Sequence, residues 1–216
     1  MVLSLNSEAS KPGKAIATAS WAFAASLGIK DEELTLEQHL ASIRNITATV
    51  ASAGLPLPDD LQEGYGSRLR EAVTQAIQAG AHGANIEDSI PAHGLGHGVE
   101  HSLCPLGEQI CRLQLAVKAA ADEDLPDFGI NARCDVFALK DGPNLHSEAR
   151  LKEAIRPHNL AGATTVFFWR GYGAGFREAD LAKLGVARIS IGRSLFQITM
   201  DAAKKSALMS FETTIS

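Results

Sequence analysis

The chain repeats one pattern of hydrophobic and polar positions. A helix-like stretch ends in glycine, a short apolar run follows, and polar residues end that run, as seen after Gly54, Gly80, Gly162 and Gly185. Glycine just past a helix is typical of a left-handed C-terminal cap. Short continuous apolar runs are typical of strands buried on both faces of a parallel sheet. We therefore predict strands near residues 15–18, 55–60, 83–87, 128–133, 164–168 and 188–191, with a weaker signal at 2–5.

Amphipathic helices separate these runs. Apolar positions recur at helical spacing from about Thr35 to Ala53, and Thr35 with Gln38 forms a capping-box sequence. The same spacing predicts a helix over 67–79 and another that begins at Pro105. The residues expected to share the apolar faces of these helices are Leu36, Leu40, Ile43, Thr47 and Val50; Leu69, Ala72, Val73, Ala76 and Ile77; and Leu106, Ile110, Leu113, Val117 and Ala120.

Alternating strands and helices predict an α/β fold, either a barrel or an open doubly wound sheet. The sequence lacks both GxGxxG after its first predicted strand and GxxxxGK[ST], which weakens the nucleotide-binding open-sheet interpretation. Barrel enzymes carry their chemistry at the C-terminal ends of strands. Those ends hold Ser20, Asp60, Glu87 and Arg133 here. We therefore predict a (β/α)8 TIM-barrel-like fold, as one domain over residues 1–216.

Composition and charge narrow the function classes. The chain has 216 residues, 45% of them hydrophobic and 21% charged, which is typical of a globular protein. Its net charge of −5, without a cluster of Lys and Arg, argues against nucleic-acid binding. No apolar run approaches the roughly 18 residues of a membrane span, and residues 2–5 are too short for a signal peptide. Three scattered cysteines indicate reduced thiols, so we expect a cytoplasmic protein without membrane partners.

Charged residues at the predicted strand ends are the first candidates for chemistry. Asp60 and Glu87 end successive strands, and two converging carboxylates suit a hard divalent cation. The alternative is that they cap helices or close the barrel rim. Arg133 could bind a substrate carboxylate through two parallel hydrogen bonds. Its alternative is a structural salt bridge to Asp135 or to a carboxylate at the rim.

The segment 89–104 contains His93, His97 and His101, with glycines between them. The spacing of four would align three imidazoles on a helix, but each glycine costs a helix roughly 1 kcal/mol relative to alanine. A mobile active-site loop is therefore expected, in which His93 or His97 could act as a general acid or base. Residues 192–194 could bind phosphate at a helix N-terminus, or simply begin a helix.

Five motifs follow one another between residues 15 and 200. They are ATASWA at 17–22 with ASLG at 25–28, DLQEGYG at 60–66, NIEDS at 85–89, INAR at 130–133 and LGVARISIG at 184–192. In this order they resemble the motifs of the isocitrate lyase/phosphoenolpyruvate mutase superfamily.

The resemblance implies an enzyme that depends on Mg²⁺ or Mn²⁺, namely a carbon–carbon lyase or a phosphonomutase-like enzyme. It would act on a small 2-oxo or 2-hydroxy carboxylate through an enolate intermediate, with cleavage or formation of a C–C or P–C bond. Asp60 and Glu87 would hold the metal ion. The substrate-binding residues that the resemblance implies are Ser20, Trp21, Ala22, Asn131 and Arg133.

The sequence departs from the family pattern at the metal motif. Gln62 stands where the family usually has a second acidic residue, so Glu63 would have to take its place as a metal ligand. Ala22 stands where the family has glycine after the carboxylate-binding serine. The cysteine-bearing loop of the lyase branch is absent, and so is the lysine- and asparagine-bearing loop of the mutase branch. The branch therefore stays open.

Two barrel units look shortened. The first strand is missing or reduced to residues 2–5, and only a short segment separates Phe168 from Leu181. A homo-oligomer formed through a C-terminal helix at about 194–210 could cover the exposed strand edges. The shortening also leaves an alternative function, a catalytically degenerate barrel relative with an interaction or regulatory role.

Overall fold

The computed structural model describes residues 13–133, 135, 139, 165–167, 183, 188–190 and 192–212. The chain divides into two compact units, Met1–Pro143 and Asn144–Ser216. Within the described part of the chain, no helix is both long and apolar enough to cross a membrane.

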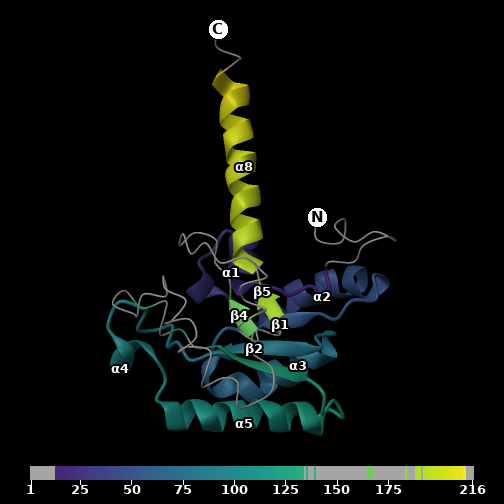
Figure 1. Ribbon diagram of the computed structural model, residues 1–216, viewed down its shortest axis with the longest axis vertical. Coiled ribbons are helices and arrows are strands. Elements are labelled where there is room, and N and C mark those ends of the chain that lie inside the picture. Colours follow the sequence, from purple (N-terminus) through teal and green to yellow (C-terminus); the bar gives the residue numbers. More distant parts are fainter. Residues whose placement is uncertain are drawn as a thin grey trace. The chain divides into compact units, whose positions relative to one another are not determined.

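A parallel sheet lies at the centre of the first unit (Figure 1). Its strands are β1 (Pro58–Asp60), β2 (Gly83–Glu87) and β3 (Gly129–Arg133), in that order across the sheet. The register pairs Asp60 with Asn85 and Glu87 with Arg133. These strands confirm three of the predicted ones and the α/β fold. Because the strands are parallel and adjacent, their C-terminal ends lie at the same edge of the sheet.

Helices α2 (Leu36–Ser52), α3 (Leu69–Gln78) and α5 (Leu106–Asp122) match the three helices predicted from periodicity. The hydroxyl of Thr35 accepts the backbone N–H of Gln38, and the side chain of Gln38 accepts the N–H of Thr35, so the capping box is confirmed. Shorter elements complete the unit: α1 (Ser20–Leu27), α4 (Val99–Ser102) and the 3₁₀ turns η2 (Asp31–Glu33) and η3 (Gly66–Arg68). The core gathers Leu36, Leu40, Ile43, Leu57, Leu61, Leu69, Val73 and Ile86.

The apolar face predicted for α5 is wrong at Leu106, Ile110 and Val117, which are exposed, but Ala120 is buried and Leu113 packs against the core, as predicted. Leu106 is 77% exposed and Val117 55%, whereas Ala116, Ala119 and Ala120 are buried. Helices α3 and α5 pack against each other on one side of the sheet (Figure 1). Small side chains let two helices approach closely, so Ala116, Ala119 and Ala120 are fully buried, whereas Leu113 and Leu115 are only partly buried against the core.

Residues 15–18 do not form the predicted strand. The N–H groups of Ile16 and Thr18 nevertheless donate to the carbonyls of Pro56 and Pro58, at 3.0 and 3.1 Å. This segment therefore runs beside β1 and brings Thr18 and Ser20 to the end of that strand.

The second unit contains the parallel pair β4 (Thr165–Phe167) and β5 (Arg188–Ser190) and the helix α8 (Gly192–Glu212). The two strands confirm the strands expected near 164–168 and 188–191, and α8 includes the helix expected at 194–210. The weak strand at 2–5 and the segment between Phe168 and Leu181 lie outside the described residues.

The sheet contains two glycines in register whose environments differ. A Cβ atom on Gly83 would lie 2.8 Å from the backbone oxygen of Gly129, whereas a Cβ on Gly129 would meet nothing within 4 Å. We expect Gly83→Ala to lower the free energy of unfolding by about 1–3 kcal/mol, because a backbone atom cannot move aside without shifting a strand. Gly129→Ala is the matched control and should change stability by less than about 0.5 kcal/mol. Equilibrium urea unfolding of both variants tests this, and equal stabilities would contradict it.

Candidate active site

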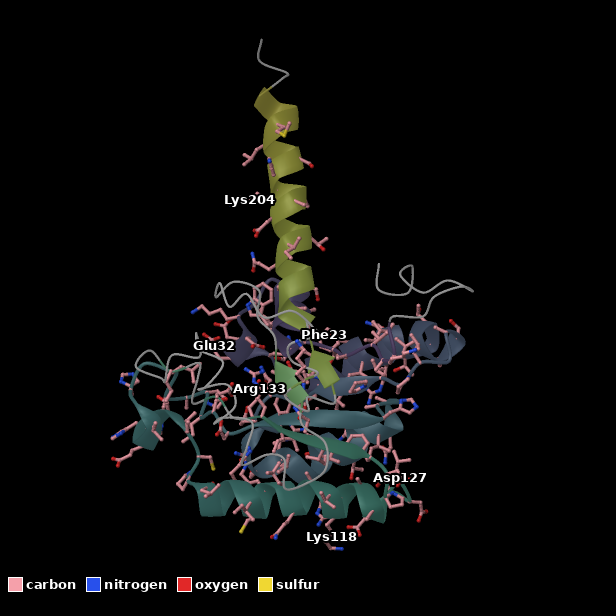
Figure 2. All side chains as sticks on the ribbon, viewed as in Figure 1. Phe23, Glu32, Lys118, Asp127, Arg133 and Lys204 are labelled. Atoms are coloured by element: carbon pink, nitrogen blue, oxygen red, sulfur yellow. The ribbon has the colours of Figure 1, made fainter. Side chains whose placement is uncertain are left out.

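Three of the predicted residues end neighbouring strands. Asp60 ends β1, Glu87 ends β2 and Arg133 ends β3. The guanidinium of Arg133 forms an ion pair with Glu87, and its Nε donates to Oδ1 of Asp135 at 2.8 Å. Arg133 is at the sheet, well away from Lys118, which points outward from α5 (Figure 2). The salt bridges considered as the alternative for Arg133 are therefore present, and they hold it beside the two candidate metal ligands.

Asp60 is a buried carboxylate with one oxygen left unpaired. Its Oδ2 accepts the backbone N–H and the hydroxyl of Ser20, at 3.2 and 3.4 Å. Its Oδ1 is buried and has no hydrogen-bond donor among the described residues. Burial raises the pKa of Asp60 against the opposing charge of Arg133 and the hydrogen bond from Ser20, and the charges of Asp59 and Asp31 raise it further. A nearby cation would relieve both the unpaired oxygen and the buried negative charge.

Glu87 shares this electrostatic environment. Burial raises its pKa to about 8 despite the charge of Arg133, and the charges of Asp135 and Asp60 add to the effect. The hydroxyl of Ser89 donates to its Oε2 at 3.0 Å. Asp60 and Glu87 are therefore close enough to repel each other, as expected of two carboxylates that face a common site.

Arg133 balances these negative charges. Burial lowers the pKa of its guanidinium, but the charges of Glu87, Asp135 and Asp60 outweigh that effect and raise it. The guanidinium is therefore a permanent positive charge at the site. This charge can meet a substrate carboxylate only if the carboxylate shares the guanidinium with its present partners.

Gln62 brings a further carboxylate to the site. Its side-chain amide donates to the backbone oxygen of Asp31 at 2.8 Å and to Oδ1 of Asp31 at 2.9 Å. The charge of Asp31 acts on the pKa of Asp60, so it lies within electrostatic reach of the site. Sequence reasoning missed Asp31, because it begins the acidic run 31–33, which has the pattern of an exposed turn. The uncharged side chain of Gln62 thus holds Asp31 near the site.

The residues predicted to bind substrate already have partners within the protein. The backbone N–H of Ser20 donates to Asp60, and that of Ala22 donates to the carbonyl of Ala19. Trp21 is half-buried in the first turn of α1. The amide of Asn131 donates to Oδ1 of Asn85 at 2.9 Å. Their substrate-binding roles stay predictions.

The remaining candidates lie on loops. Oε1 of Glu63 accepts the N–H of Gly66 at 3.0 Å, so its carboxylate folds back on its own loop and its role as a metal ligand stays a prediction. His93 and His97 line an open cavity of about 500 Å³ with Ala92 and His101. Helix α4 occupies only the end of this segment, as the glycines led us to expect. Whether His93 or His97 acts as an acid or base stays a prediction.

The donor set suits Mg²⁺. This ion keeps several waters and binds proteins through one or two carboxylates. Asp60 and Glu87 supply two carboxylates, and the unpaired Oδ1 of Asp60 is an oxygen that a cation would satisfy. Among the described residues, no group of three or more His, Cys, Asp or Glu side chains converges to hold a metal directly. Two protein ligands completed by water are therefore the arrangement that fits.

Comparison with known proteins identifies the family. Residues 2–175 match the family model described as phosphoenolpyruvate phosphomutase. The 2-methylisocitrate lyase of Escherichia coli (strain K12) is 37% identical over 121 residues, which are 54% of this chain and 39% of that protein, so the match spans well under half of this relative.

Two crystal structures share the fold. That of 2,3-dimethylmalate lyase, a PEP mutase/isocitrate lyase superfamily member, has a TM-score of 0.77 at 19% identity over 93% of this chain and 73% of its own. That of phosphonopyruvate hydrolase in complex with oxalate and Mg²⁺ has a TM-score of 0.64 at 20% identity over 90% and 73%. The chain belongs to the phosphoenolpyruvate phosphomutase family, within the PEP mutase/isocitrate lyase superfamily.

Proposed function

We propose that the protein is a Mg²⁺- or Mn²⁺-dependent enzyme that acts on a small 2-oxo or 2-hydroxy carboxylate through an enolate intermediate. The reaction would cleave or form a C–C or P–C bond. The observation that carries the proposal is the meeting of Asp60, Glu87 and Arg133 at three adjacent strand ends, where one buried oxygen of Asp60 has no hydrogen-bond partner among the described residues. A site that pairs carboxylates with a guanidinium can take a cation and an anionic metabolite together.

The acidic residues of the site and its arginine would have different roles. Asp60 and Glu87 would hold the metal ion, and Asp31 would add negative charge through Gln62. The metal, when bound, supplies a Lewis acid that stabilises negative charge on substrate oxygens. Arg133 would bind the substrate carboxylate through its planar donor fork.

The neighbouring segments would complete the site. Ser20, Trp21 and Ala22 in the first turn of α1, with Asn131 on β3, would line the substrate pocket. His93 and His97, on the 89–104 segment, would supply a general acid or base.

Relatives support this substrate class. Phosphonopyruvate hydrolase was solved with oxalate and Mg²⁺, and oxalate has two carboxylates in the arrangement of a 2-oxo acid enolate. The E. coli relative is a 2-methylisocitrate lyase, so a carbon–carbon lyase activity is also in keeping with the family.

We also propose the finer architecture. Residues 1–216 would form one (β/α)8 barrel domain that is shortened in its first and seventh units, with segment 89–104 as a mobile loop over the site. Helix α8 (Gly192–Glu212) would mediate a homo-oligomer, since Ile198, Met200, Leu208 and Met209 are about half exposed on it. Burial of such side chains against a second copy would stabilise that assembly.

Isothermal titration calorimetry with oxalate tests the function. We expect oxalate to bind in the presence of saturating Mg²⁺ and to bind much more weakly, or not at all, after Mg²⁺ is removed with a chelator. Binding of sulfate with the same Mg²⁺ is the control, because sulfate has the same charge without two adjacent carboxylates. Absence of oxalate binding at saturating Mg²⁺ would overturn the proposal and favour a catalytically degenerate relative.

A further inference from the structure

Four polar side chains form a continuous hydrogen-bonded chain next to Asp60 in the fold. Thr18 Oγ1 donates to Oδ1 of Asp59 at 2.5 Å. Nε2 of His39 lies 3.0 and 3.1 Å from the two carboxylate oxygens of Asp59. Nδ1 of the same ring lies 2.7 Å from the hydroxyl of Tyr65. His39 is 0% exposed and Asp59 1%, so water cannot replace these partners.

The hydrogen bonds of this chain have a consistent direction. Burial raises the pKa of Tyr65, and the charge of Asp59 raises it further, so the hydroxyl stays protonated. The Tyr65 hydroxyl can therefore donate to Nδ1 of His39 in the tautomer whose Nε2–H donates to Asp59. This assignment of the tautomer satisfies every polar atom of the imidazole and gives the carboxylate a donor on each side.

His39 joins both ends of the segment that carries Asp60. Asp59 directly precedes Asp60 on β1, and Tyr65 lies in the loop that follows the strand. The backbone of this loop is strained, because two of its left-handed residues have side chains: Gln62, with φ of 53°, and Tyr65, with φ of 61°. Such conformations cost about 1–3 kcal/mol each and persist only where surrounding contacts hold them. Among the described residues, the hydrogen bond to the side chain of Tyr65 is made by His39.

The loop in turn connects the acidic residues of the site. The carbonyl of Gln62 accepts the backbone N–H of Glu87 at 2.8 Å, and its amide holds Asp31. A shift of the loop would therefore move Asp60, Glu87 and Asp31 relative to one another. In the part of the chain that the structure describes, no hydrogen bond joins His39 to Asp60, Glu87 or Asp31, so any effect of His39 on them would pass through Asp59 and Tyr65.

We propose that His39 is a positioning residue: its two ring nitrogens hold Asp59 and Tyr65 so that Asp60 and Glu87 face one cation. The proposal rests on the proposed function for the metal, but it has a consequence in the metal-free protein. Loss of the two hydrogen bonds should loosen residues 60–66 while the rest of the unit stays folded.

Three variants separate the two bonds. His39→Leu removes both, and we expect it to weaken Mn²⁺ binding about 10–100-fold, the range typical of residues that orient metal ligands. His39→Gln keeps an amide that can donate to Asp59, so we expect a smaller loss. Tyr65→Phe removes only the hydroxyl. Tyr65→Phe and His39→Gln are both expected to break the same hydrogen bond, the one between the Tyr65 hydroxyl and Nδ1 of His39. The double variant should therefore weaken Mn²⁺ binding no more than the worse of the two single variants.

The matched control is Ile43→Val, one turn further along α2 in an equally buried position. It should destabilise the protein without changing Mn²⁺ affinity, because the side chain of Ile43 is apolar and forms none of the hydrogen bonds of the chain. Mn²⁺ affinity is measured by electron paramagnetic resonance of the free ion, without substrate. Hydrogen exchange of the metal-free protein reports on residues 60–66, and it should speed up in His39→Gln but not in Ile43→Val.

The outcomes separate the two proposals. Wild-type protein that binds no Mn²⁺ would overturn the proposed function, and hydrogen exchange alone would then decide the role of His39. Unchanged exchange at residues 60–66 in His39→Gln would overturn the positioning role. Mn²⁺ affinity within twofold of wild type in both His39→Gln and Tyr65→Phe would also overturn the positioning role. These two variants decide the question even if His39→Leu does not fold.

Discussion

Replacement of Arg133 by methionine is expected to abolish oxalate binding and to lower the free energy of unfolding by about 3–5 kcal/mol. Methionine keeps much of the side-chain volume but leaves Glu87 and Asp135 buried without their cation. Removal of one partner from a buried ion pair costs this much because the remaining charge is uncompensated. Oxalate would also lose the guanidinium that would bind its carboxylate. Urea unfolding and calorimetry with Mg²⁺ measure the two effects.

Two further variants assign the effect to the site. Arg70→Met breaks an ion pair with Asp122 whose side chains are 44% and 46% exposed, so it should cost at most about 1 kcal/mol and leave oxalate binding unchanged. Arg133→Lys keeps the charge without the planar fork, so it should recover part of the stability but little of the oxalate affinity. If Arg133→Met binds oxalate as wild type does, Arg133 has only the structural role that its ion pairs show.

The sequence predicted the elements whose signals are local. The Thr35–Gln38 capping box lies within one turn, and the helix that follows begins where it predicts. The runs before Asp60, Glu87 and Arg133 are parallel strands in the structure, and the predicted meeting of these residues follows from that geometry alone. Strand ends in a parallel sheet share an edge, so no long-range contact had to be guessed.

The failures share a different origin. Periodicity assigned Leu106, Ile110 and Val117 of α5 to the core, but they are exposed, while Ala116 and Ala119 are buried on a helix that packs against α3. Which residues of α5 are buried depends on the shape of that other helix. Asp31 reaches the site through an amide 31 residues away in sequence. His39 faces Asp59, 20 residues away, from a position that reads as one polar residue in an amphipathic helix. None of these pairings has a signature in spacing, because only the folded backbone brings the partners together.

The site carries an energetic conflict that follows from its proposed work. Burial raises the pKa of both Asp60 and Glu87, and neighbouring carboxylates add to the effect: Asp59 and Asp31 on Asp60, and Asp135 and Asp60 on Glu87. A protein selected only for stability would place neutral side chains there. Carboxylates kept in such an environment are expected where a cation binds, because the bound ion supplies the charge that the fold lacks.

Substitution of Asp60 by asparagine should therefore stabilise the metal-free protein while it removes metal binding. Asparagine is nearly the same size, and its oxygen can accept the two hydrogen bonds from Ser20. It carries no buried charge, so we expect the free energy of unfolding at pH 7 to rise by about 0.5–2 kcal/mol, as for other stabilising substitutions at functional sites. Mn²⁺ affinity should fall at least about 100-fold, because a neutral amide oxygen replaces a carboxylate ligand.

The pH dependence distinguishes this cause from better packing. Because the pKa of Asp60 is raised in the folded state above its ordinary value of 3.8, the folded protein holds a proton that the unfolded chain releases as pH rises. Wild-type stability therefore declines relative to Asp60→Asn above about pH 4, and the two should converge below it.

Asp122→Asn is the matched control: its carboxylate is exposed and paired with Lys118 and Arg70, so the change should not stabilise the protein or alter Mn²⁺ affinity. Thermal unfolding from pH 3 to pH 8 measures the stability difference. A gain that persists undiminished at pH 3, or Mn²⁺ binding that survives in Asp60→Asn, would mean that the buried charge of Asp60 does not serve a cation.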